Sequence, residues 1–285
     1  MVLAEGRWAW WNQYGSVPIA TCARRAKAAA RDGLRGVIVK WGYQEARMAF
    51  AEAGGAWATE RYVYPNQPEV EARRLAADMA AGARFAVINA EIEWEPLGPE
   101  PMQRFIGEFW RRQPTAELYA SVDTRGGRLS LPYQRVLAEH VAGWLPMIYP
   151  KAFRPRRPAG YVAPAFRDCL DGKDFGGKPV LPTLQTYDRI GAEAVRAQVA
   201  EVRRRGLAGC QAYTIAHATD EEWQAFTKRS DMEAIEDLRR DFKQFVWQHG
   251  IGHAVAAAFL RAAAHALRNE PLPEELQDAL RRIIR

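Results

Sequence analysis

Short apolar runs alternate with stretches of helical periodicity from the start of the sequence to about residue 228. A short apolar run bounded by glycine or proline is typical of a buried strand, whereas apolar residues at every third or fourth position are typical of a helix. Eight strands are expected, within residues 7–15, 36–44, 56–65, 85–96, 116–125, 143–153, 179–188 and 208–218. A helical pattern follows each run. It is weakest in the long connection 154–178, where only APAFRDCLDG is helical in character.

Eight strand-and-helix units in about 228 residues predict an α/β fold of the (β/α)8 or TIM-barrel type over residues 1–228. A doubly wound open sheet alternates in the same way, but it usually has fewer strands. It also tends to carry a glycine-rich phosphate-binding turn after the first strand. Here the first strand continues into WNQYGSVP, which contains no G-x-G-x-x-G pattern. The barrel is therefore favoured.

Residues 229–285 have a different pattern, with three amphipathic helices and no expected strand. Turn signals at Gly250 and at Pro271 and Pro273 separate the helices. We expect a small all-α C-terminal domain or a cap on the barrel. Its apolar face is structural by default, and contact with a protein partner or a second copy is the lesser alternative.

Composition and charge limit the classes of function. The chain has no apolar run near the roughly 18 residues that a membrane helix requires, and MVLAEGRWAWWNQYG lacks the basic n-region of a signal peptide. A cytoplasmic protein is expected, with phage association as an alternative. A net charge of +6, from 40 Lys and Arg against 34 Asp and Glu, is too diffuse for a dedicated nucleic-acid binder. The three cysteines, odd in number and widely spaced, predict neither disulfides nor a metal site.

The segment FAVINAEIEWEP (85–96) places Glu91, Glu93 and Glu95 at alternate positions after an apolar run. Alternate residues of a strand project to the same face. If Ala86 and Ile88 face the helices, Glu91 and Glu93 project into the barrel at its carboxyl end, where TIM barrels carry their active sites. In the fifth strand, the same reasoning turns Asp123 inward. These four carboxylates are the candidate catalytic residues.

Aromatic and polar side chains are expected to gather near the same carboxyl ends. Aromatic rings beside carboxylates suit a sugar, because its C–H face stacks on a ring while its hydroxyl groups bind acids and amides. The candidate substrate-binding residues are Lys40, Trp41, Trp11, Trp94, Tyr149, Gln185, Tyr187 and Tyr213.

Paired carboxylates can cleave a glycosidic bond when one keeps a proton for the leaving oxygen and a second group meets the developing positive charge. Residues two apart on a strand are separated by roughly 6.5–7 Å, so each carboxylate raises the pKa of the other. The alternative without catalysis is an internal ion-pair network in which Lys40 and Arg61 neutralise the glutamates. A Schiff base on Lys40 is another alternative.

No cofactor is expected, and the histidines show no zinc-binding spacing. Glu91, Glu93 and Asp123 could hold a hard cation through their oxygens, but no metal site is predicted.

The stretch AEIEWEP resembles the D-x-D-x-E signature of family 18 (chitinase-type) glycoside hydrolases, and PMIYPKAF resembles the Met-x-Tyr of that family's sixth strand. The same acidic stretch is similar to the Asp-x-Glu strand of family 25, the lysozyme type. Both resemblances imply a (β/α)8 barrel that acts on N-acetylated sugars. Family 18 implies Glu95 as proton donor with Glu93 assisting, whereas family 25 implies Glu93.

The sequence departs from both patterns. Glutamate stands where both families have aspartate, and RWAWWNQYG lacks the aspartate that family 25 has in its first strand. Glu93 is the preferred donor, because Glu95 abuts Pro96; Tyr149 and Asp123 are the next candidates, to position the acetamide or tune the acid. We expect hydrolysis of peptidoglycan or a chitin-type polysaccharide. The alternative is a catalytically degenerate barrel that binds carbohydrate or has a structural role, for instance in a phage particle.

Overall fold

We describe a computed structural model of the chain, which defines position 4, residues 6–12, 14–40, 42–153 and 159–228, and positions 273, 274 and 277. The chain divides into two compact units, Met1–Thr227 and Lys228–Arg285. The three expected helices of residues 229–285 lie almost entirely outside the described residues, so the all-α character of the second unit stays a prediction.

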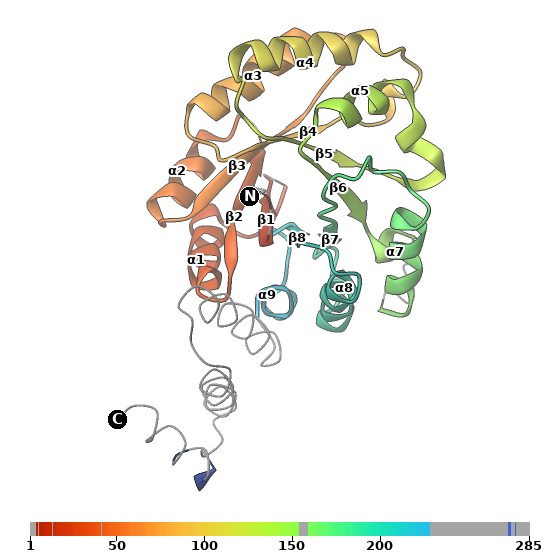
Figure 1. Cartoon of the computed structure of the whole chain (residues 1–285). Coiled ribbons are helices and arrows are strands. Elements are labelled where there is room, and N and C mark those ends of the chain that lie inside the picture. The colour runs from red at the N-terminus through yellow and green to blue at the C-terminus, as the bar shows by residue number, and fades with distance from the viewer. Residues whose placement is uncertain are drawn as a thin grey trace. The chain divides into compact units, whose positions relative to one another are not determined.

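The first unit is a closed barrel in which eight parallel strands pair in chain order and β8 pairs with β1. Figure 1 looks along this barrel, with the strands at the centre and the helices around them. The strands are β1 (Gly6–Trp11), β2 (Leu34–Lys40), β3 (Ala56–Tyr62), β4 (Ala86–Asn89), β5 (Leu118–Val122), β6 (Gly143–Ile148), β7 (Thr183–Gln185) and β8 (Gly209–Tyr213). The predicted TIM barrel is confirmed.

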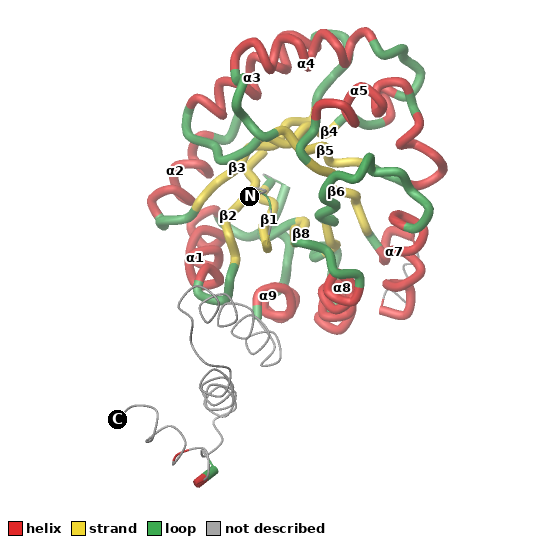
Figure 2. Tube along the Cα trace, viewed as in Figure 1, coloured by secondary structure: helices red, strands yellow, loops and turns green. Residues whose placement is uncertain are grey.

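Helices follow the strands as expected and form the outer layer (Figure 2). They are α1 (Ile19–Ala30), α2 (Gln44–Glu52), α3 (Pro68–Ala80), α4 (Glu100–Arg112), α5 (Pro132–His140), α6 (Pro150–Phe153), α7 (Val162–Leu170), α8 (Ala192–Arg204) and α9 (Asp220–Thr227), with 3-10 turns η1 (Ile92–Trp94), η2 (Arg125–Ser130) and η3 (Ala159–Tyr161). The weak helical pattern after the sixth strand becomes α7. Among these residues, no helix has the length and apolar character that crossing a bilayer requires.

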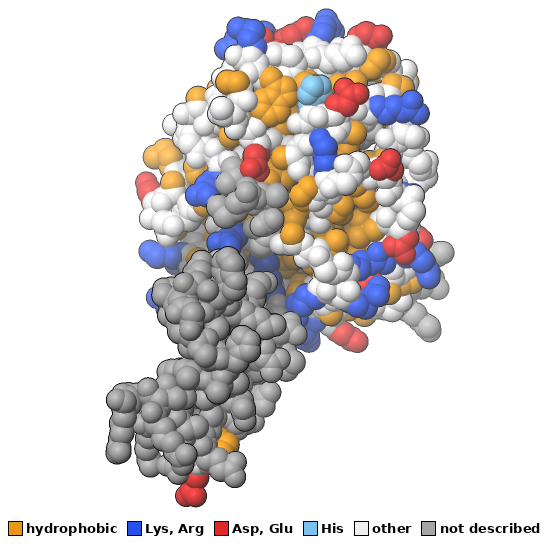
Figure 3. All heavy atoms as spheres, viewed as in Figure 1, with side chains coloured by type: hydrophobic (Ala, Val, Ile, Leu, Met, Phe, Trp, Pro, Cys, Tyr) orange, Lys and Arg blue, Asp and Glu red, His pale blue; other side chains and the backbone are white. Residues whose placement is uncertain are grey.

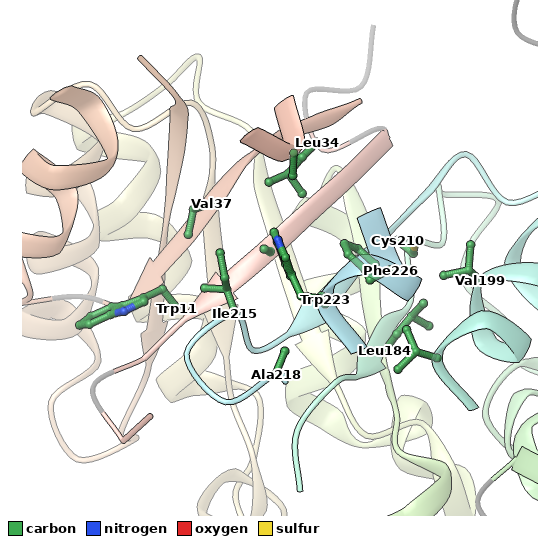
Figure 4. Close-up of a cluster of buried hydrophobic side chains, with 14 of the residues drawn as sticks. Trp11, Leu34, Val37, Leu184, Val199, Cys210, Ile215, Ala218, Trp223 and Phe226 are labelled. Carbon is green, nitrogen blue, oxygen red and sulfur yellow. The ribbon is translucent and has the colours of Figure 1, made fainter. Parts of the chain in front are cut away.

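Side-chain alternation along the strands sorts the core into two layers. Val37 and Val39 of β2 belong to the cluster between the barrel and its helices, whereas Ile38 belongs to the barrel interior. Ala86 and Ile88 of β4 likewise pack outward. Figure 4 shows part of the outer cluster, in which Val37 and Leu34 lie with residues of β8 and α9. The predicted inward and outward parities of these strands are confirmed.

Aromatic side chains fill the barrel interior. Trp8 packs edge-on against Phe85 with ring centroids 4.7 Å apart, and Phe85 packs against Tyr119 at 5.1 Å. Trp8 also explains the glycine at position 36, since a Cβ there would lie 2.6 Å from its ring and 2.2 Å from the Ala56 carbonyl oxygen. The barrel is thus a packed core with its polar residues concentrated toward one end.

The fourth strand is shorter than the sequence pattern predicts. β4 ends at Asn89, and the chain then turns through η1, with the Trp94 N–H bonded to the Glu91 carbonyl oxygen at 3.0 Å. The expected alternation of Glu91, Glu93 and Glu95 along one strand is therefore wrong. In a 3-10 turn side chains rotate by about a third of a turn per residue, so the three carboxylates diverge.

Candidate functional site

Glu60 of β3 is a carboxylate inside the barrel wall. Its neighbour two residues earlier, Ala58, packs in the barrel interior, and strand alternation gives Glu60 the same inward face. Only 4% of the residue is exposed. It pairs in register with Lys40 of β2 and with Val87 of β4. Glu60 is not among the site residues that the sequence pattern predicts, because it lies in the middle of a strand beside Arg61.

Burial, the largest cause, and the nearby Glu91 charge together raise the pKa of Glu60 to about 7, against the opposing effects of Lys40, Arg61 and Asn89. The carboxyl group therefore changes its charge near neutral pH, where an ordinary glutamate is fully ionised.

Glu91 follows β4 and lies at the mouth of the barrel, half-buried. Burial raises its pKa, the charges of Glu93 and Asp123 raise it as well, and a hydrogen bond from Asn89 lowers it. A half-buried carboxyl group with a raised pKa is suited to proton donation.

Glu93 lies at the rim beside Tyr62. It is exposed, and one of its carboxylate oxygens accepts a hydrogen bond from the Tyr62 hydroxyl at 2.5 Å. Burial of Tyr62 and its hydrogen bond to Glu93 raise the pKa of the Tyr62 hydroxyl, so it remains a donor at ordinary pH. The geometry of Glu93 favours a rim position.

Glu95 and Asp123 belong to an ion-pair cluster on the β5 side of the mouth. Arg128 donates to Glu95 at 2.8 Å and to Asp123 at 3.2 Å, and Arg125 donates to both Asp123 oxygens at 2.8 and 2.6 Å. Burial opposes ionisation of Asp123, but the hydrogen bonds and charge of Arg125, with the charge of Arg128, outweigh it and lower the pKa. Asp123 is thus held as a carboxylate.

Three predicted tyrosines meet at the same end of the barrel. The ring centroids of Tyr149, Tyr187 and Tyr213 lie 5.6, 5.9 and 5.7 Å apart in pairs. Burial raises the pKa of Tyr213 to about 12, the Glu60 and Glu91 charges contribute, and Asn12 donates to its hydroxyl oxygen at 3.2 Å. The same two carboxylates help raise the pKa of Tyr149, so the tyrosine cluster faces the glutamates.

Several buried polar atoms at this end have no hydrogen-bond partner among the described residues. They are Asn89 Oδ1, Gln185 Nε2 and Trp10 Nε1. Gln185 is 1% exposed, and its Oε1 accepts from the Lys151 backbone N–H at 2.9 Å. Buried polar groups are normally satisfied by protein, water or ligand. These atoms are therefore available to a polar ligand or to water.

A hollow of about 310 Å³ lies at the rim, lined by Lys40, Arg61, Tyr62, Tyr64 and Glu93. The Tyr62 and Tyr64 rings are 5.2 Å apart, and Tyr64 is 50% exposed. Lys40 also lies over the Tyr14 ring, 5.0 Å from its centroid. This rim hollow offers an aromatic surface beside charged groups.

Two of the three predicted tryptophans, Trp11 and Trp94, lie in the outer layer and not in the site. Trp11 is buried in the outer layer, where its ring packs against Tyr43 of the β2–α2 connection with ring centroids 5.4 Å apart. Figure 4 shows Trp11 among the residues of this outer cluster. Trp94 is 0% exposed, donates from Nε1 to the Val63 carbonyl oxygen at 2.8 Å and packs against Tyr133. Trp41 lies outside the described residues.

Three further observations concern the predicted partner of Arg61, the possible metal site and the distribution of surface charge. Arg61 pairs with Glu71 of α3 on the outer side of the barrel. Within the described ranges no group of three or more His, Cys, Asp or Glu side chains could hold a metal ion. Positive and negative side chains are interspersed on the face drawn in Figure 3.

Comparison with known proteins extends the structural description. The sequence matches no protein-family model, and a search of curated proteins finds no relative. Solved structures do match. A class V chitinase from Pseudomonas fluorescens aligns with a TM-score of 0.53 at 12% identity, over 78% of this chain and 98% of the chitinase.

Two further structures have similar scores. A chitinase from Chromobacterium violaceum aligns with a TM-score of 0.52 at 12% identity, over 78% of this chain and 98% of that one. The spore cortex-lytic enzyme SleL from Bacillus cereus aligns with a TM-score of 0.54 at 9% identity, over 78% and 73%. At these identities the likeness establishes the fold. The predicted remote resemblance to glycoside hydrolase barrels is confirmed at that level.

Proposed function

We propose that this barrel hydrolyses glycosidic bonds in an N-acetylated polysaccharide, with Glu91 as the proton donor. The observation that carries the proposal is the position of Glu91, half-buried at the barrel mouth with a raised pKa and facing the tyrosine cluster. The sequence pattern favoured Glu93 for this role. Glu91 is the better candidate, because a general acid must still hold its proton near neutral pH and Glu93 is exposed.

Asp123 is the candidate for the second carboxylate. Its lowered pKa favours the ionised form, whereas the raised pKa of Glu91 favours the protonated form, and opposite shifts of two neighbouring carboxyl groups mark an acid and an anionic partner. The negative charge would stabilise the positive charge that develops at the anomeric carbon, or would orient the substrate's own acetamide. Tyr149 and Tyr213 would contact the sugar.

The substrate class rests on the structural neighbours and on the sequence resemblance. Two neighbours are chitinases and one is a spore cortex-lytic enzyme. Aromatic side chains at the mouth and around the rim hollow suit the C–H faces of sugar rings, and the Gln185 Nε2 group, which lacks a partner among the described residues, suits a sugar hydroxyl or acetamide oxygen. Chitin oligomers and peptidoglycan are therefore the substrates to test.

The decisive experiment compares hydrolysis of both substrates by the wild type and by the Glu91→Gln, Glu93→Gln and Glu95→Gln variants. We expect Glu91→Gln to lower kcat by about 10²–10⁴-fold, the usual contribution of a general acid. Glu201→Gln, a change on α8 on the outside of the barrel, is the matched control and should retain activity. Full activity of Glu91→Gln would contradict the assignment.

A carbohydrate-binding barrel without catalysis is the second candidate function. The observation in its favour is that arginines form ion pairs with Glu95 and with Asp123. These ion pairs reduce the number of free carboxylates at the mouth. Calorimetric titration with chitin oligomers tests it. Binding without hydrolysis by the wild type would favour this candidate.

A further inference from the structure

We propose that the rim hollow binds a free amino-acid group, with an ammonium and a carboxylate on one carbon, at the end of a peptide that is attached to the glycan. Peptidoglycan is the N-acetylated polysaccharide that carries such peptides. The inference rests on the proposed function and narrows its substrate class from N-acetylated polysaccharides in general to those with a zwitterionic peptide branch.

Two side chains of opposite charge line the rim hollow without pairing. Lys40 is the last residue of β2, and Glu93 belongs to η1 after β4. Within the part of the chain that the structure describes, no ion pair joins them, and neither has an ion-pair partner elsewhere. Opposite charges that are held apart in one hollow can each bind a ligand group of the other sign.

A tyrosine holds each of the two charges in place. The Lys40 ammonium lies over the Tyr14 ring, 5.0 Å from its centroid, and Glu93 accepts a hydrogen bond from the Tyr62 hydroxyl at 2.5 Å. A ring covers one side of an ammonium group, and a single hydroxyl takes one of the several acceptor positions of a carboxylate. Lys40 can therefore still donate to a ligand carboxylate, and Glu93 can still accept from a ligand ammonium group.

The charges next to these two side chains do not alter the pattern. Arg61 also lines the hollow, but its guanidinium already pairs with the buried carboxylate of Glu71 from α3. Glu60 is the neighbour of Lys40 in the β2–β3 register, but it is 4% exposed and is not among the residues that line the hollow. A ligand in the hollow thus meets the Lys40 cation and the Glu93 anion.

The size of the hollow suits one small zwitterionic group. Its volume of about 310 Å³ is at the lower end of the range for small-molecule sites, so it accommodates a single amino-acid group. The half-exposed Tyr64 ring continues the wall beside Tyr62 and offers a surface to the sugar that carries the peptide. A chitin oligomer is uncharged and offers no counterpart to either charge.

Calorimetric titration of the full chain tests the inference. The probe is an N-acetylmuramyl peptide that ends in diaminopimelate, whose side chain carries an ammonium and a carboxylate on one carbon. It contains no glycosidic bond between sugars, so the protein does not consume it. Two matched probes have the side-chain ammonium acetylated or the side-chain carboxylate amidated. Each should bind about five-fold more weakly, the upper end for an exposed ion pair. Equal affinity for all three probes, or no binding, overturns the inference.

Two variants assign the charges to their partners. Lys40→Met should no longer distinguish the carboxylate probe from its amide but should still prefer the free ammonium, because Glu93 remains. Glu93→Gln should show the reverse. Each variant is compared with itself over the three probes, so a general loss of affinity does not imitate the result. If both variants keep both preferences, the inference is overturned.

The controls make the same chemical changes outside the hollow. Lys27→Met on α1 and Glu52→Gln on α2 alter exposed charges of the outer helices and should keep both preferences. Loss of a preference in either control would overturn the assignment to the rim hollow. The comparison of probes on the wild type requires no variant, so it decides the inference even if a variant does not fold.

Free diaminopimelate distinguishes the two sources of this ligand chemistry. It should bind more weakly than the muramyl peptide, because it lacks the sugar; equally tight binding overturns the assignment to peptidoglycan. Hydrolysis of peptidoglycan or chitin oligomers, together with equal affinity for the three probes, overturns this inference alone. A lack of hydrolysis overturns the proposed function, and the probe preferences then decide the ligand of the hollow independently.

Discussion

Glu91 and Asp123 follow the neighbouring strands β4 and β5 at the barrel mouth, and their surroundings move the two pKa values in opposite directions. Burial and neighbouring carboxylates raise the pKa of Glu91. The pKa of Asp123 is lowered, because the hydrogen bonds and charges of Arg125 and Arg128 exceed the effect of burial. The charge of an ionised Asp123 is itself one of the causes that raise the pKa of Glu91. Two side chains with the same functional group, a carboxyl, are thus adapted to different roles, Glu91 as the acid and Asp123 as the anion, by their surroundings alone.

Asp123→Asn should lower kcat about 10²–10³-fold, the usual effect of removing one electrostatic contact to a transition state. The amide has no charge to stabilise the anomeric carbon. The change also removes the ion pairs of Asp123 with Arg125 and Arg128, while Arg128 keeps its pair with Glu95. Rates on chitin oligomers measure the effect. Asp171→Asn, which removes an aspartate paired with Arg205 on the outside of the barrel, is the control. Equal losses in the two variants would contradict a role for Asp123.

Tyr64→Ala should weaken binding of long oligosaccharides several-fold and leave short ones almost unchanged. Tyr64 lines the rim hollow, so only a chain that extends beyond the tyrosine cluster reaches it. Measurement of KM against oligomer length tests this. Met48→Ala is the matched control, because Met48 is similarly exposed at 52% but lies on α2. A uniform change over all lengths would argue against a rim subsite.

Stability should fall as the pH rises from about 4.5 to about 7. Glu60 has a folded pKa of about 7 against 4.5 for the ordinary group, so the folded state binds more protons in this window. The free energy of unfolding then decreases with pH by at most about 3 kcal/mol for this residue. Urea titrations over this range measure it. Glu60→Gln should flatten the decrease, and an equally steep decrease in that variant would refute the burial of an ionisable Glu60.

Trp94→Ala should reduce the free energy of unfolding by about 3–5 kcal/mol, as expected for loss of a fully buried tryptophan. The change removes packing against Tyr133 and the hydrogen bond to the Val63 carbonyl. Denaturant unfolding and oligosaccharide binding, measured together, separate a role of Trp94 in core packing from a role in sugar binding. Unchanged stability with lost binding would return Trp94 to the list of sugar contacts.

Much of the site could be predicted from strand ends. Lys40, Asp123, Tyr149, Gln185, Tyr187 and Tyr213 lie at or just beyond the carboxyl ends of their strands, as strand alternation indicated. Trp11 obeys alternation too, but on the outer face, because Trp10 takes the inner one. An aromatic residue near a strand end carries no information about its face unless the neighbouring positions differ in polarity, and WAWW does not.

The sequence by itself determined the barrel. Its apolar residues alternate eight times between strand spacing and helix spacing, and each strand and helix so formed buries its own apolar face. Tertiary structure alone decided how the carboxylates meet. The chain leaves β4 at Asn89 and turns, so the regular spacing of Glu91, Glu93 and Glu95 does not persist in space. Glu60 and Arg61 are adjacent charges with no alternation to tell them apart. Only closure of the barrel, with α3 outside and Lys40 beside Glu60 within, places one charge in the core and the other against Glu71.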